Sequence, residues 1–140
     1  MTQFEILTNY IPKLEGNHFG KWVVDTENDG SSERPIHMPY VDYSAIIYNF
    51  VHDFYQFENE NNDLKLNYYQ NILNENNIDW RSESMITADV SDLNAQAILA
   101  LIMGVIRADR FSEGTLLEFF QNGCMVKWLM QLQLLDDIGD

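Results

Sequence analysis

The chain has 140 residues, a length typical of one domain, and we expect a single domain over residues 1–140. Its hydrophobic fraction of 46%, with three prolines and seven glycines, is typical of a globular protein and excludes a disordered or collagen-like chain. Twenty-two acidic residues against eight basic ones give a formal charge of −14. This charge disfavours binding to nucleic acid or to an anionic membrane and favours a basic partner.

The N-terminal part predicts one helix and a small β-hairpin. Apolar residues recur at spacings of three and four over residues 4–14, which predicts an amphipathic helix that ends at Gly16. Residues 21–25 and 36–41 favour two short strands, and Pro39 restricts the second to a sheet edge. The polar stretch between them predicts a long turn.

Two helices are predicted next. Asp42 or Ser44 can cap the first of them, whose apolar stripe spans residues 46–54. Residues 58–63 are acidic and rich in asparagine, which predicts a connector. Helical spacing of apolar residues resumes over residues 64–73 and predicts the second helix.

The most apolar run of the chain predicts a central helix. Residues 81–90 are polar and weakly patterned, so we expect a loop there, with Ser91 capping a helix over roughly residues 92–110. Apolar residues fill most positions of this helix, so other helices must cover it on nearly all sides. Its apolar run is about ten residues long, whereas a membrane-spanning helix needs roughly 20.

Two shorter helices complete the prediction. Ser112 predicts a helix start, the pair at residues 122–123 predicts its end, and residues 125–132 predict a last short helix. The acidic tail over residues 136–140 is expected to fray. The predicted fold class is therefore α+β and predominantly α-helical, with five to six helices around the central helix and a small N-terminal β-hairpin.

The residue types that most often form metal and thiol sites show no such pattern here. Cys124 cannot form a disulfide within the chain, and the N-terminus does not resemble a secretory signal, so we expect a cytoplasmic protein with a buried cysteine. His18, His37 and His52 lack metal-ligand spacing. Residues 25–36 begin like a calcium loop but hold isoleucine where the bidentate glutamate belongs. We predict no metal and no cofactor.

Arg107 and Arg110 form the one basic constellation in this acidic chain. They lie three residues apart at the end of the predicted central helix, so their side chains project from neighbouring positions. In one interpretation they favour the helix C-terminus electrostatically and form ion pairs with Asp109, Glu113 or Glu118 that join two helices.

In the alternative interpretation the arginine pair is a binding site. Arg107 and Arg110 would bind an anionic group or carboxylate in a bidentate manner. Trp80 or Trp22 would then provide a stacking wall. The sequence leaves both interpretations open.

Around the arginine pair the sequence resembles a known family. Residues 107–114 read Arg-Ala-Asp-Arg-Phe-Ser-Glu-Gly, and shorter matching elements lie at residues 10–12, 22–23, 78–80, 122–123 and 128–132. Together these elements resemble the domain-of-unknown-function family 6508, a bacterial and phage family. The resemblance implies a small, cytoplasmic, mostly helical domain and brings no established activity or catalytic residue. It also implies that Arg107, Arg110, Phe111 and Gly114 form a fixed structural junction.

The functional expectation rests on absent motifs and on charge. The chain has no nucleophile elbow, Walker loop or dinucleotide-binding glycine motif, so we predict no catalytic residue and expect a non-enzymatic interaction or regulatory module with a basic protein partner. Half of the net charge lies in residues 41–90, which hold nine acidic and two basic residues. One alternative is a small-anion-binding protein or enzyme that uses Arg107 and Arg110. Another is an acidic inhibitor that mimics nucleic acid.

Overall fold

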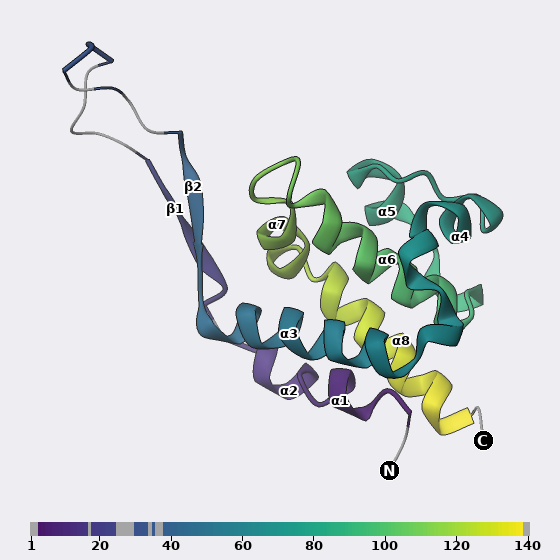
Figure 1. Ribbon diagram of the computed structural model, residues 1–140. Coiled ribbons are helices and arrows are strands. Elements are labelled where there is room, and N and C mark those ends of the chain that lie inside the picture. Colours follow the sequence, from purple (N-terminus) through teal and green to yellow (C-terminus); the bar gives the residue numbers. More distant parts are fainter. Residues whose placement is uncertain (1–2, 17, 25–29, 34, 36–37, 139–140) are drawn as a thin grey trace.

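A two-stranded hairpin projects from a group of packed helices, in a computed structural model that describes residues 3–16, 18–24, 30–33, 35 and 38–138 (Figure 1). The fold class is thus confirmed as α+β and mostly helical. The α-helices are α1 (Glu5–Thr8), α2 (Ile11–Leu14), α3 (Ala45–Glu60), α4 (Tyr69–Glu75), α5 (Ser82–Thr87), α6 (Ala95–Ala108), α7 (Thr115–Gln121) and α8 (Cys124–Ile138). The short 3₁₀ helices are η1 (Asn62–Leu64), η2 (Leu66–Tyr68) and η3 (Val90–Asp92), and the strands are β1 (Gly20–Val23) and β2 (Tyr40–Tyr43).

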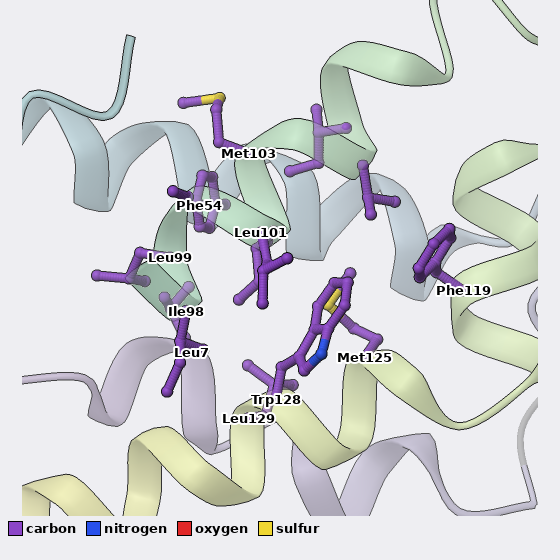
Figure 2. Close-up of a cluster of buried hydrophobic side chains, with 14 of the residues drawn as sticks. Leu7, Phe54, Ile98, Leu99, Leu101, Met103, Phe119, Met125, Trp128 and Leu129 are labelled. Carbon is purple, nitrogen blue, oxygen red and sulfur yellow. The ribbon is translucent and has the colours of Figure 1, made fainter. Parts of the chain in front are cut away.

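Helix α6 is the central element, as its apolar sequence predicts. All ten residues from Ala97 to Ile106 are buried, and the helix packs against α4, α7 and α8. In the core, Leu101 of α6 lies with Phe119 of α7 and Trp128 of α8 (Figure 2). Burying this much apolar surface is the main favourable contribution to folding.

The start of α6 differs from the prediction. Asn94, and not Ser91, is its N-cap: the Asn94 Oδ1 atom accepts a hydrogen bond of 2.9 Å from the backbone N–H of Ala97. Ser91 instead lies in η3, where its backbone N–H donates a hydrogen bond to the carboxylate of Asp89. The expected loop at residues 81–90 is also wrong, because α5 and the start of η3 occupy it.

The predicted N-terminal helix is two short helices, α1 and α2. Pro12 lies in the first turn of α2, where its missing N–H costs nothing, whereas a continuous helix would place it in the interior. The strands pair antiparallel, with Trp22 opposite Val41. Strand β2 begins only after Pro39, and residues 36–37 of the predicted second strand lie outside the described part of the chain.

The middle helices also differ from their predicted bounds. The acidic connector expected at residues 58–63 begins inside α3, which continues to Glu60. The second predicted helix is broken into η1, η2 and α4. Lys65 has a positive φ of 54° between the two 3₁₀ turns, so one continuous helix cannot form.

The C-terminal segment is a long helix, and the prediction of a frayed acidic tail is wrong over its described residues. Helix α8 continues to Ile138, and Asp136 on it is buried. The Asp136 carboxylate accepts a hydrogen bond of 3.1 Å from the backbone N–H of Phe4, so α1 and the C-terminal part of α8 lie side by side (Figure 1).

Candidate functional site

Four side chains, from three helices and the loop after α6, meet beside the C-terminal end of α6. Arg107 lies in the last turn of α6 and Arg110 in the loop that follows. Both guanidinium groups donate to the hydroxyl of Tyr55 on α3, from Arg107 Nε at 3.2 Å and from Arg110 Nη2 at 3.1 Å. Arg107 Nη2 also donates to Asn67 Oδ1 on η2 at 3.4 Å. We call Arg107, Arg110, Tyr55 and Asn67 the arginine cluster.

The arginine cluster contains no carboxylate. Arg81 pairs with Asp79, and His52 lies within 4.0 Å of Asp53, whereas no carboxylate of the described residues lies within 4.0 Å of the guanidinium groups of Arg107 and Arg110. The predicted ion pairs of the two arginines with Asp109, Glu113 or Glu118 are therefore wrong. Within the described part of the chain, both guanidinium groups donate to neutral acceptors, and the guanidinium carbon of Arg107 also lies 5.8 Å from the centre of the Tyr55 ring.

Asp109 has other partners. Its Oδ1 atom accepts hydrogen bonds from the hydroxyl of Tyr43 at 2.8 Å, the backbone N–H of Gly114 at 3.1 Å and the backbone N–H of Leu116 at 3.0 Å. These bonds join β2 to the start of α7 and satisfy backbone donors that a helix N-terminus leaves free. We call this group the Asp109 junction.

The Asp109 junction raises the pKa of Tyr43. Burial raises the pKa of the Tyr43 hydroxyl, and the hydrogen bond to the carboxylate of Asp109 raises it further. The Tyr43 hydroxyl also accepts a hydrogen bond of 3.2 Å from the backbone N–H of Leu117, so it connects the hairpin to α7 directly and to the end of α6 through Asp109. The neutral phenol is the form that this arrangement requires.

Glu113 also binds the hairpin. Its carboxylate accepts a hydrogen bond of 2.9 Å from the backbone N–H of Val41. The hydrogen bond anchors β2 to the loop between α6 and α7. Predicted as a partner of the arginines, this carboxylate binds a backbone donor instead.

Trp80 and Trp22, the two tryptophans expected beside the arginines, pack on glycines. Trp80 donates from Nε1 to the carbonyl of Gly104 at 2.9 Å. The ring of Trp22 covers Gly114, where an added Cβ would lie 2.3 Å from its Cζ2 atom. Gly114 also has a φ of 95°, a conformation that favours glycine. Trp80 or Trp22 was expected to provide a stacking wall for the arginines, and the aromatic ring that lies against Arg107 is that of Tyr55.

Tyr55 carried no signal in the sequence. It lies next to Phe54 at the end of an apolar stripe, and only the tertiary fold brings it within hydrogen-bonding distance of the arginines. The resemblance implied a fixed junction, and the structure places Gly114 in one. Phe111 is 82% exposed, although its ring meets Trp80 edge-on.

The remaining titratable candidates come together in no metal-binding group among the described residues, and His37 with residues 25–29, 34 and 36 of the calcium-like stretch lies outside those residues. Cys124 is buried at the start of α8, and burial raises the pKa of its thiol, which makes the reactive thiolate rarer. Within the described ranges, no group of three or more histidine, cysteine, aspartate or glutamate side chains could hold a metal ion.

A second surface lies along α8. Met130, Leu134 and Ile138 are 55%, 50% and 72% exposed and follow one another at intervals of four residues, so they form an apolar stripe on one helix face. Beside it a groove of about 520 Å³ runs between η3 and α8, lined in part by Val90 and Lys127. We call the stripe and this hollow the α8 groove. The sequence pattern predicted a helix end near residue 132, so this surface was not predicted.

The comparisons with known proteins give a family. A family model described as "Family of unknown function (DUF6508)" matches residues 1–137. The chain belongs to the DUF6508 family. Its match covers the residues of the arginine cluster and nearly all of the α8 groove. No curated protein and no solved structure matches this DUF6508 chain. None of its described helices combines the length and the apolar character that crossing a membrane requires.

Proposed function

We propose that the chain is a non-enzymatic protein-interaction domain, and that it binds a basic amphipathic helix of a partner protein in the α8 groove. The observation that carries this proposal is the exposed apolar stripe of Met130, Leu134 and Ile138 beside the groove. An amphipathic helix presents its own apolar residues at the same helical spacing and can lie along such a groove.

The charge around the α8 groove favours a basic occupant. Asp89 and Asp137 lie among its lining residues, whereas Lys127 is the one basic residue there. The whole chain has a formal charge of −14, which attracts a basic partner from a distance and raises its association rate. A second copy of this chain is a poorer occupant, because two such charges repel one another.

Binding of designed peptides tests the proposal directly. Two labelled 18-residue helical peptides share one leucine stripe, and the polar face is lysine in the first and glutamate in the second. We expect the lysine peptide to bind the purified protein more tightly. Met130→Ser with Leu134→Ser should weaken this binding at least about tenfold, because two apolar anchors are lost.

A matched variant separates the groove from general charge attraction. Val24→Ser with Met38→Ser removes two exposed apolar side chains from the hairpin and should leave peptide affinity unchanged. Equal binding of the lysine peptide to both double variants would contradict the proposal, and so would equal binding of both peptides to the parent protein. Self-association lost in the Met130 and Leu134 variant would identify a second copy as the occupant and overturn the proposed partner.

A further inference from the structure

We propose that the arginine cluster binds the phosphate group of a small phosphate ester. The starting observation is that two guanidinium groups meet at one tyrosine hydroxyl, and neither has a carboxylate partner among the described residues. In a chain with 22 acidic residues, this pairing of unneutralised cations is the arrangement that an external dianion completes.

The donor inventory supports an oxyanion. A guanidinium has several N–H donors in a fixed fork, and the hydrogen bonds within the cluster use two on Arg107 and one on Arg110. Arg110 is exposed and Arg107 is half-buried, so the unused donors are accessible to a ligand. Arginine forks match the spacing of oxygens on phosphate and carboxylate groups.

Tyr55 is the positioning residue of this site. Its hydroxyl accepts from both guanidinium groups, which holds them side by side, and its ring supports Arg107. The phenolic O–H is itself a donor and can turn toward a bound oxygen atom. Because the hydroxyl is uncharged, it orients both cations without neutralising either.

Charge selects phosphate over carboxylate and a small ligand over a large one. A phosphate monoester carries close to two negative charges at neutral pH and can neutralise both Arg107 and Arg110, whereas a carboxylate neutralises one. The formal charge of −14 repels a long polyanion such as nucleic acid. A small phosphate ester therefore fits the cluster best.

Titration with phenyl phosphate tests the site. The readout is the ¹⁵N chemical shift of the arginine Nε–H groups, with sodium chloride at matched ionic strength and sodium benzoate as parallel titrations. We expect saturable shifts with phenyl phosphate and much weaker ones with benzoate. Arg107→Gln and Arg110→Gln should each reduce affinity about tenfold, the loss of one charge-assisted interaction.

Two further variants give the controls. Arg81→Gln removes an arginine that is paired with Asp79, and its affinity should stay within about twofold of the parent, the range expected for a distant charge. Tyr55→Phe keeps the ring and removes the hydroxyl, so we expect weaker binding without loss of the folded circular dichroism spectrum. Equal affinity in the Arg81, Arg107 and Arg110 variants, equal shifts with chloride, or tighter binding of benzoate would each overturn the proposal.

Discussion

Asp109 and its neighbours Arg107 and Arg110 lie within four residues of one another, yet they have opposite surroundings. One oxygen of Asp109 accepts three hydrogen bonds from the hairpin and α7, whereas the arginines turn to the neutral side chains of Tyr55 and Asn67. The difference shows that opposite charges close in sequence need not pair. A helix start leaves backbone donors that need an acceptor, and Asp109 satisfies them.

The largest expected effect is at the acidic side of this comparison. Asp109→Ala removes the acceptor of Tyr43, Gly114 and Leu116, so these partly buried donors lose their partner. We expect the free energy of unfolding to fall by about 3 kcal/mol, measured by urea denaturation. Asp109→Asn keeps an oxygen acceptor and should lose less. A loss below about 1 kcal/mol in the alanine variant would show that the Asp109 junction is not an anchor.

Gly114→Ala tests the same junction through its backbone. An added Cβ would lie 2.3 Å from Trp22 Cζ2, and alanine is strained at a φ of 95°. We expect a loss of about 2 kcal/mol in the free energy of unfolding. Gly123→Ala is the matched control, because its φ is 86° but nothing lies within 4 Å of the added Cβ. Equal losses in both variants would exclude a contribution from the Trp22 contact.

Alkaline pH should weaken the tyrosine contacts of Asp109 and Asp53. Burial and a hydrogen bond to a carboxylate raise the pKa of Tyr43, at Asp109, and of Tyr10, at Asp53. A group whose pKa is higher in the folded state stabilises the fold below its unfolded pKa, about 10 for tyrosine, and that stability is lost as pH rises further. We expect the urea midpoint to fall between pH 9 and pH 11.

Phenylalanine variants assign this pH dependence. Tyr43→Phe with Tyr10→Phe should be less stable at neutral pH, because two hydrogen bonds are lost, but flatter between pH 9 and pH 11. Tyr68→Phe changes an exposed tyrosine and should keep the slope of the parent. If the double variant has that slope as well, Tyr43 and Tyr10 do not cause it.

Much of the fold could be predicted because hydrophobic periodicity is a local signal. The buried run of α6 and the stop at Gly123, whose φ is positive, follow from residue types along one segment. Helix α5 was missed because its six residues bury one apolar side chain, Met85, which is too little pattern to detect. The extent of α8 was missed because Asp136 belongs to an acidic segment that is typical of an exposed tail. Its burial depends on the hydrogen bond from Phe4, which is distant in sequence.

The candidate site could be predicted only in part. The spacing of Arg107 and Arg110 along a helix end marked them as a pair, which is local information. Their partners Tyr55 and Asn67 lie 52 and 40 residues away from Arg107 in sequence and meet it through tertiary packing alone. Asp109 accepts hydrogen bonds from backbone amides and not from an arginine because the start of α7 lies beside it, and this too depends on tertiary packing.

The smallest expected effect is at the basic side of the comparison. Arg107→Gln and Arg110→Gln break no ion pair and remove one of two neighbouring like charges. They lose the hydrogen bonds to the neutral side chains of Tyr55 and Asn67 and a favourable contact with the C-terminal end of α6. These terms oppose one another, so each variant should change the free energy of unfolding by no more than about 0.5 kcal/mol. Arg81→Gln, which breaks an exposed ion pair, should change it by a similar amount. If instead either variant matched the loss of Asp109→Ala, the arginines would be structural anchors like Asp109. A small loss would agree with the proposal that the arginines bind a ligand.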